Sequence, residues 1–100
     1  MALVMCQDET YIGKDRWEWS VWVDGPPEEL DALDRVVYVL HPTYHDPVRT
    51  VKDRARKFRL STSGWGTFTI HAKAIRKDGE ETLLVHELVL RYPDGMATLA

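Results

Sequence analysis

The chain has 100 residues, of which 44% are hydrophobic and 29% are charged, a composition typical of a globular domain. Its net charge of -3 at pH 7 argues against a general nucleic-acid or anionic-membrane binder, because such proteins are usually strongly basic. No segment approaches the ~18 consecutive apolar residues of a membrane-spanning helix. We therefore expect a single domain over residues 1–100 that makes no membrane contact itself.

The single cysteine, Cys6, cannot form an intramolecular disulfide. A reducing compartment is the simplest setting for such a chain, so we expect a cytoplasmic protein. Cys6 lies in a short apolar segment, where a free cysteine behaves as a small hydrophobic residue rather than as a nucleophile.

Period-two alternation begins at residue 17 and predicts a half-buried strand over 17–24. The side chains expected on its buried face are Trp17, Trp19, Val21 and Val23. Residues 28–34 could form a helical turn, but we interpret them as a short connection into a strand over 35–40. That strand carries hydrophobic residues on both faces, which predicts a central strand covered on both sides.

The second half of the chain continues this pattern. Residues 48–60 are polar and basic, with one or two short strands expected between apolar anchors at Val51, Phe58 and Leu60. Residues 67–76 alternate cleanly, and Asp78-Gly79 predicts a type I′ hairpin turn into a return strand over 82–92. The inward-facing residues of the first of these strands are Phe68, Ile70, Ala72 and Ala74. Several short strands with turns between them predict an all-β, antiparallel β-sandwich without a convincing helix.

Four histidines invite a metal interpretation. Pro42 excludes the helix that would bring His41 and His45 together, and His71 and His86 could pair only across the predicted hairpin. No further Cys, His or carboxylate group completes a site, so we expect no metal and no cofactor.

Six basic residues between positions 49 and 59 stand against five acidic residues between 24 and 34. Such a run is usually a solvated face, although it could bind an acidic partner peptide or a phosphate. Nucleic acid is the weaker alternative, because the run lacks interleaved aromatic residues. We find no nucleophile–base–acid set, no paired-carboxylate frame and no phosphate-binding loop, so we expect no enzyme activity.

Two aromatic loops are the most informative segments. Glycines flank Trp65 in the turn 64–66, which clears space around the indole and leaves its backbone N–H accessible. The segment 41–44, His-Pro-Thr-Tyr, follows the strand over 35–40. If the two loops meet in space, Tyr44 and Trp65 form an aromatic-walled slot for a flat or apolar ligand.

These motifs, in this order along the chain, resemble those of the YEATS domain family. The resemblance covers residues 17–90 and depends on two segments as a pair, Leu-His-Pro-Thr-Tyr over 40–44 and Gly-Trp-Gly-Thr-Phe over 64–68. The short, acidic chain and its tryptophan-rich strand over 16–22 are closer to the prokaryotic YEATS-like branch than to the eukaryotic readers. The resemblance implies an immunoglobulin-like β-sandwich that recognises an acylated lysine without catalysing a reaction.

The resemblance also implies a set of binding residues. The acylated side chain would slide between Tyr44 and Trp65, and its amide would bind the Trp65 backbone N–H and the Thr43 hydroxyl. His41 would help to fix the floor of the slot, and Phe68 would close its inner edge. The expected ligand-binding residues are His41, Thr43, Tyr44, Gly64, Trp65, Gly66 and Phe68.

Three positions depart from the pattern of the readers. Asp15 stands near the place of an aromatic residue that borders their pocket, residues 55–57 replace consecutive prolines, and Thr43 replaces serine. The alternative function is therefore a structural or oligomerising protein–protein interaction module of a larger bacterial signalling or membrane-associated protein. Its partner would bind a sheet face or the basic run. The ligand is a protein or peptide in both cases, and the oligomeric state stays open.

Overall fold

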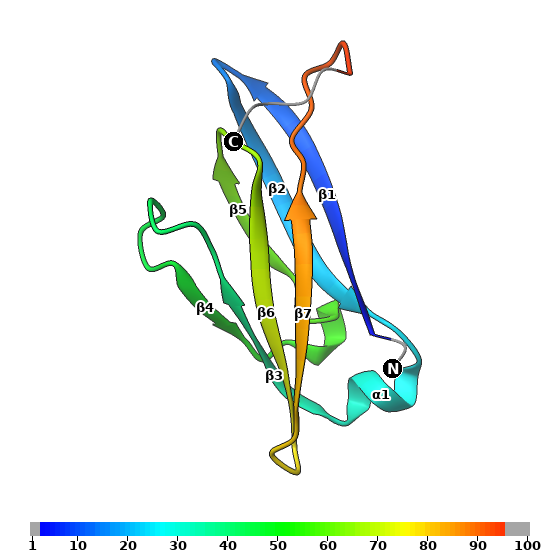
Figure 1. The fold of residues 1–100 in the computed structure, drawn as a ribbon. Coiled ribbons are helices and arrows are strands. Elements are labelled where there is room, and N and C mark those ends of the chain that lie inside the picture. The colour runs from blue at the N-terminus through cyan, green and yellow to red at the C-terminus, as the bar shows by residue number, and fades with distance from the viewer. Residues whose placement is uncertain (1–2, 96–100) are drawn as a thin grey trace.

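The computed structural model describes residues 3–95, which form two antiparallel sheets packed face to face (Figure 1). One sheet has the strand order β1-β2-β5, and the other has the order β4-β3-β6-β7. The strands are β1 (Val4–Gly13), β2 (Arg16–Asp24), β3 (Leu33–Val39), β4 (Val48–Val51), β5 (Leu60–Gly64), β6 (Phe68–Arg76) and β7 (Glu81–Leu88). The predicted all-β sandwich is confirmed.

A short helix, α1 (Pro27–Asp31), joins β2 to β3, so the interpretation of this segment as a plain connection was wrong. Its first turn holds a proline, whose fixed φ suits a helix start, and two glutamates that favour the positive end of the helix. Leu30 is buried and ties the helix to the core. A single 3₁₀ turn, η1 (Arg54–Arg56), lies between β4 and β5.

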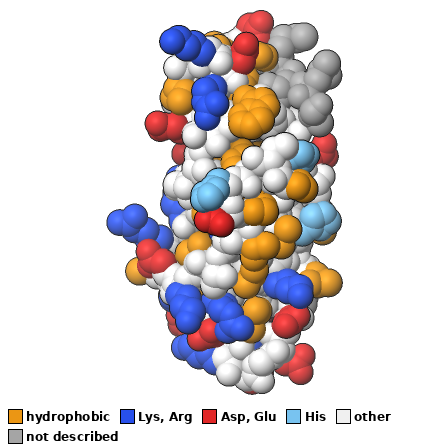
Figure 2. Space-filling view, turned by 90° about the vertical axis from the view of Figure 1, so that its left-hand side faces the viewer, with side chains coloured by type: hydrophobic (Ala, Val, Ile, Leu, Met, Phe, Trp, Pro, Cys, Tyr) orange, Lys and Arg blue, Asp and Glu red, His pale blue; other side chains and the backbone are white. Residues whose placement is uncertain are grey.

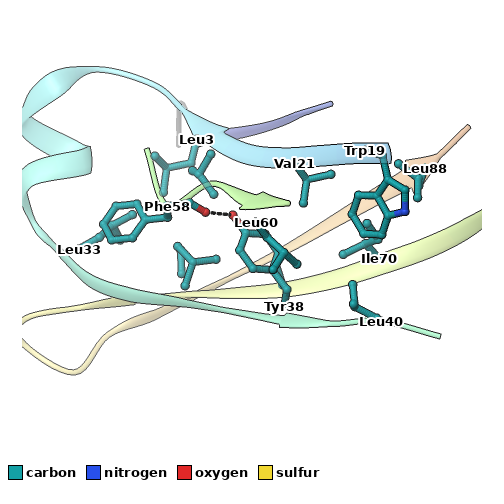
Figure 3. Close-up of a cluster of buried hydrophobic side chains, with 14 of the residues drawn as sticks. Leu3, Trp19, Val21, Leu33, Tyr38, Leu40, Phe58, Leu60, Ile70 and Leu88 are labelled. Carbon is teal, nitrogen blue, oxygen red and sulfur yellow. Dashed lines mark hydrogen bonds between the residues drawn. The ribbon is translucent and has the colours of Figure 1, made fainter. Parts of the chain in front are cut away.

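The core lies between the sheets and follows the predicted alternation (Figure 3). The inner side chains of β2 are all almost fully buried, as predicted: Trp17, Trp19, Val21 and Val23. The Tyr38 hydroxyl on β3 donates a hydrogen bond to the Phe58 carbonyl at 2.6 Å, which links the four-stranded sheet to the segment before β5. The predicted anchors Phe58 and Leu60 are buried.

Strand β3 is central, as predicted, because it pairs with both β4 and β6. The expectation that both of its faces are covered was wrong. Val36 and Tyr38 are buried on the inner face, but Val39 on the outer face is 39% exposed. Val48, the partner of Val39 on β4, is exposed as well, so the outer face of this strand meets solvent.

The hairpin between β6 and β7 is confirmed, but its turn type was wrong. A type I′ turn needs positive φ at both central residues, and here only Gly79 has one, at 94°. A three-residue loop results, closed by bonds from the Gly79 N–H to the Arg76 carbonyl at 2.9 Å and from the Arg76 N–H to the Glu80 carbonyl at 2.8 Å. The turn with two left-handed residues lies instead between β1 and β2, at Lys14 and Asp15.

The return strand ends at Leu88 rather than at residue 92, because Leu88 already pairs with Phe68, the first residue of β6. The next residue, Val89, bonds to the Gln7 side chain of β1 instead. The Gln7 amide donates to the Val89 carbonyl at 2.9 Å and accepts from the Val89 N–H at 3.3 Å. One side chain thereby joins the edges of the two sheets.

Candidate functional site

The β3–β4 loop and the β5–β6 turn meet at one side of the sandwich, towards the upper left of Figure 1. Between them lies a slot of about 150 Å³. The residues that line it are His41, Thr43, Tyr44, Trp65, Gly66, Thr67 and Phe68. The structure therefore brings together six of the seven residues expected from the sequence, and the seventh, Gly64, lies directly behind Tyr44.

Two aromatic rings form the walls of the slot. The rings of Tyr44 and Trp65 are almost parallel, with an interplanar angle of 7° and a centroid separation of 6.4 Å. Carbon atoms in contact lie ~3.5–4 Å apart, so a flat group between two rings needs a spacing of roughly 7 Å. The centroid separation is an upper limit for the perpendicular spacing of the two rings, so they must move apart before a flat group can stack between them. Trp65 is 54% exposed, which leaves its ring open to a ligand.

Tyr44 is fixed from below by the core. Its hydroxyl accepts a hydrogen bond from Trp19 Nε1 at 3.2 Å, and its backbone N–H donates to the His41 carbonyl at 3.0 Å. A Cβ at position 64 would overlap that hydroxyl, so only glycine leaves Tyr44 in place. Burial raises the pKa of Tyr44, although the Trp19 hydrogen bond and the Arg16 guanidinium oppose the shift, and the hydroxyl stays neutral.

The Thr43 hydroxyl is oriented by His41. A hydrogen bond of 2.8 Å joins His41 Nδ1 to Thr43 Oγ1, and the Thr43 backbone N–H donates to the same nitrogen at 3.2 Å. In this hydrogen-bond network Nδ1 is the acceptor, so the Thr43 hydroxyl also donates to it. The lone pairs of Thr43 Oγ1 are then available to a donor in the slot.

Phe68 forms the floor of the slot at the start of β6. Its ring packs against Tyr44 at 5.4 Å, Trp19 at 6.0 Å and His41 at 6.1 Å between centroids. His41 itself is exposed and lines the side of the slot, rather than lying beneath it. Among the described residues, no acceptor meets the backbone N–H groups of Trp65 and Gly66.

Two residues of the site were missed by sequence reasoning. Thr67 lines the slot beside Gly66. Arg16, the first residue of β2, places its guanidinium carbon 5.7 Å from the centroid of the Trp65 ring. No sequence motif marks Arg16, and only the strand register β1-β2-β5 reveals that it lies beside this turn.

The charged and metal-binding alternatives find little support in the described part of the chain. The basic run faces the acidic run, with Arg54 bound to Asp31 at 2.8 Å and Lys57 to Asp24 at 3.0 Å. His71 lies opposite Val85 rather than His86, so the suggested histidine pair was wrong. No group of three metal-binding side chains occurs within residues 3–95, and no helix there is long and apolar enough to cross a membrane.

A second hollow, of about 500 Å³, lies over the outer face of the β1-β2-β5 sheet. Hydroxyl and charged side chains line it, including Glu18, Ser20 and Ser61. Ser20 and Ser61 bond to each other across β2 and β5 at 2.8 Å. This polar lining is typical of a solvated sheet face.

Comparison with known proteins places the chain among YEATS domains. It is 33% identical over 79 residues to the AF-9 homolog of Saccharomyces cerevisiae, covering 75% of this chain and 34% of that protein. It is 39% identical over 77 residues to transcription initiation factor TFIID subunit 14 of Schizosaccharomyces pombe, covering 71% of this chain and 31% of that protein. The chain thus spans about a third of the curated relatives it matches.

The solved structures support the same family fold. The YEATS domain of Yaf9 superimposes with a TM-score of 0.68 at 25% identity, over 92% of this chain and 72% of the other. The Yaf9 YEATS domain bound to H3K27ac gives a TM-score of 0.69 at 24% identity, over 96% and 75% of the two chains. The model of the prokaryotic YEATS domain matches residues 17–89. The chain belongs to the prokaryotic YEATS domain family.

Proposed function

We propose that this domain is a non-enzymatic reader that binds an acylated lysine side chain between Tyr44 and Trp65. The observation that carries the proposal is the pair of parallel rings 6.4 Å apart, which border an accessible slot. The relatives support it, since the Yaf9 YEATS domain has been solved bound to H3K27ac and recognising an H3K122suc peptide. This chain is also 33% identical to the AF-9 homolog of Saccharomyces cerevisiae, so the similarity to YEATS proteins is one of sequence as well as of fold.

The chemistry of the slot suits an uncharged amide. Acylation removes the positive charge of lysine, and a neutral amide enters an aromatic slot at a much lower desolvation cost than an ammonium group. The unpaired N–H of Trp65 or Gly66 would donate to the acyl carbonyl, and Thr43 Oγ1 would accept from the amide N–H. The two rings would stack on the flat faces of the amide.

The ligand in this proposal is a protein or peptide of the compartment in which the domain works. A lone cysteine suits a reducing compartment, and we assign the domain to the cytoplasm. Ion pairs neutralise much of the basic run, which favours a peptide over nucleic acid as the partner.

The proposal is tested by mapping binding onto the domain with NMR. We would titrate the labelled domain with peptides of one sequence that carry acetyl-lysine, crotonyl-lysine or unmodified lysine. We expect saturable amide shifts centred on Thr43, Tyr44 and Trp65 with the acylated peptides only. Saturable shifts centred elsewhere, or equal shifts with unmodified lysine, would contradict the reader function.

A second candidate function is protein–protein interaction through the outer face of the four-stranded sheet. Hydrophobic side chains form a column on the face shown in Figure 2, with Lys and Arg side chains gathered at its lower end. The strand register puts Val48, Val39, His71 and Val85 in one row across the sheet. The exposed fraction is 58% for Val48 and 67% for Val85, and exposed apolar patches of this kind often mark contact surfaces.

This second candidate is tested by the solution mass of the domain. An interaction module that self-associates would show a mass that rises with concentration, and Val85→Lys would return it to the monomer. A constant monomer mass in light scattering would count against self-association. The slot would bind peptide equally well in the wild-type domain and in Val85→Lys, because Val85 lies on the outer face of the four-stranded sheet, away from the core.

A further inference from the structure

Strand β7 forms one edge of the four-stranded sheet, where it pairs with β6 on one side only (Figure 1). It runs for eight residues in continuous register with β6, without a bulge. The other edge strands differ, since β4 and β5 have only four and five residues and β1 carries a bulge near Gly13. A long and regular edge is a template for a further strand. Among the edges within residues 3–95, β7 is therefore the best suited to accept one.

The backbone groups on the open side of β7 belong to its odd-numbered residues. The Arg76 N–H donates to the Glu80 carbonyl at 2.8 Å, so Glu80 faces β6, and every second residue of an antiparallel strand does the same. At the other end, the N–H and carbonyl of Val89 bind the Gln7 side chain of β1 and face away from β6. The residues that direct their backbone groups outward are therefore Glu81, Leu83, Val85 and Glu87.

Side chains of β1 close one end of this edge and leave its middle open. Gln7 binds both backbone groups of Val89, and Glu9 Oε2 accepts from the Arg91 N–H at 2.7 Å. Among residues 3–95, the outward N–H groups of Leu83 and Val85 have no such partner. A further strand can therefore pair along the middle of β7 without displacing the contacts of β1.

The side chains on this stretch favour such pairing. Leu83 is 70% exposed and Val85 is 67% exposed, and both lie on the outer face of the sheet. Natural edge strands are often protected by lysine or proline, but residues 81–87 contain neither. Exposed aliphatic side chains beside unpaired backbone groups gain most from a partner that covers both.

We propose that β7 pairs antiparallel with β7 of a second copy of this chain, which joins two four-stranded sheets into one continuous sheet. This surface is separate from the slot, and it narrows the second candidate function, on which the proposal rests, to one strand. The edge is complementary to itself. With Leu83 on the twofold axis, the two Leu83 side chains meet, and Val85 lies opposite Glu81 of the second copy.

Charge selects this register over its neighbour. If Leu83 lay opposite Val85 of the second copy, Glu81 would lie opposite Glu87, and like charges directly opposite each other are destabilising. With Leu83 on the axis, no carboxylate lies opposite another, and the copies share about six backbone hydrogen bonds. Such a contact is smaller than a standard interface, so we expect a dissociation constant on the order of 100 µM.

The first test is the solution mass of the wild-type domain, Leu83→Pro and Val48→Lys in sedimentation equilibrium. Proline at position 83 removes an outward N–H and leaves the bonds between β7 and β6 intact. Val48 lies on β4, at the far edge of the same sheet face, and is the matched control. We expect the wild type and Val48→Lys to shift from monomer towards dimer between about 10 µM and 1 mM, while Leu83→Pro stays monomeric.

The second test measures the register by disulfide cross-linking, with oxidised glutathione as the oxidant and Cys6→Ala as the background. Paired Leu83 positions lie about 5.5 Å apart between Cα atoms, within the range of a disulfide. Paired Val85 positions are offset by four residues, or roughly 13 Å, which is too far. We expect Leu83→Cys to form the linked dimer at least about fivefold faster than Val85→Cys. These variants keep the backbone donors, so they decide the question even if proline disrupts the fold.

The outcomes separate edge pairing from the functions proposed above. Association that Val48→Lys abolishes and Leu83→Pro retains overturns edge pairing and leaves docking through the sheet face in place. Equal cross-linking of Leu83→Cys and Val85→Cys overturns the pairing as well. A wild-type domain that stays monomeric at 1 mM overturns self-association of either kind. The reader function is independent of all three results, because Leu83 does not line the slot.

Discussion

Replacing Gly64 by alanine tests how the slot is built. A Cβ at this position would overlap the Tyr44 hydroxyl and lie 3.1 Å from its Cζ atom. Tyr44 has little freedom to yield, since its ring packs on Phe68 at 5.4 Å and its hydroxyl accepts from Trp19 Nε1 at 3.2 Å. Gly64→Ala must therefore push the Tyr44 ring out of position.

The expected cost follows from the contacts that are lost. Breaking the Trp19–Tyr44 hydrogen bond leaves a buried indole donor unpaired, which costs ~1–3 kcal/mol. Overpacking adds a similar amount, of about 1–3 kcal/mol, but the loop over 40–47 can shift and relieve part of it. We expect Gly64→Ala to lower the free energy of unfolding by about 2 kcal/mol and to weaken binding of acylated peptide.

A double-mutant cycle isolates the contact. Tyr44→Phe removes the hydroxyl that the new Cβ would meet, so the double variant should be more stable than the sum of the two single changes predicts, by about 1 kcal/mol. Urea unfolding followed by tryptophan fluorescence measures all four proteins. Ser63→Ala, at the neighbouring position of β5, is the matched control and should unfold close to the wild type. Strictly additive effects, or a Gly64→Ala variant as stable as the wild type, would refute the steric argument.

Three further predictions concern stability. Gln7→Ala should lower the free energy of unfolding in urea by about 2 kcal/mol, because the N–H and carbonyl groups of Val89 lose their partner. An unchanged midpoint would show that the edges of the two sheets stay together without the Gln7 side chain. Tyr38→Phe should cost ~1–2 kcal/mol, since the buried Phe58 carbonyl loses its donor at 2.6 Å, and a smaller cost would mean that water replaces it. Burial lowers the pKa of His86 below its usual value of 6.5, so the unfolded chain binds the proton more tightly and stability should fall as the pH drops below 6.5. His86→Gln should remove that part of the pH dependence, and an identical pH profile would contradict the assignment.

The strands that sequence reasoning located best are those with one buried face. In β2 and β6 the inner residues are large or apolar and the outer ones are mostly polar, so alternation alone defines both strands. Alternation fails for β3, where Val37 and Val39 are hydrophobic but face outward. A hydrophobic outer face can meet a partner or solvent, and the local sequence does not distinguish such a face from one that is buried in the core.

The turns were harder to predict than the strands. Lys14 and Asp15 both adopt left-handed conformations without a glycine, and the contacts of Asp15 with Tyr11 and Tyr92 that hold this turn come from distant parts of the chain. Local propensity therefore favoured Asp78-Gly79 as the type I′ turn. In the structure a longer loop at this position satisfies the Arg76 backbone on both sides.

The slot was predictable because its residues lie in two compact motifs, one on each loop. The contacts that hold the slot in place were not predictable in the same way. Gly64 is required by the Tyr44 hydroxyl rather than by the backbone conformation of the turn. Arg16 reaches Trp65 only because β2 pairs with β5 in a register that aligns Trp17 with Gly64. Such pairings depend on the whole fold, so no local pattern signals them.

In the proposed reader, Tyr44 and Trp65 hold an acylated lysine between their rings. The most direct test measures the affinity of an acetyl- or crotonyl-lysine peptide for the wild-type domain, Trp65→Ala and Trp22→Ala, with the unmodified peptide as reference. Trp22 lies on the outer face of β2, so its loss controls for removing a tryptophan. We expect the wild type and Trp22→Ala to bind the acylated peptide alike and Trp65→Ala to lose at least tenfold in affinity, or ~1.4 kcal/mol. Equal affinity in Trp65→Ala would show that the slot does not hold the acylated lysine.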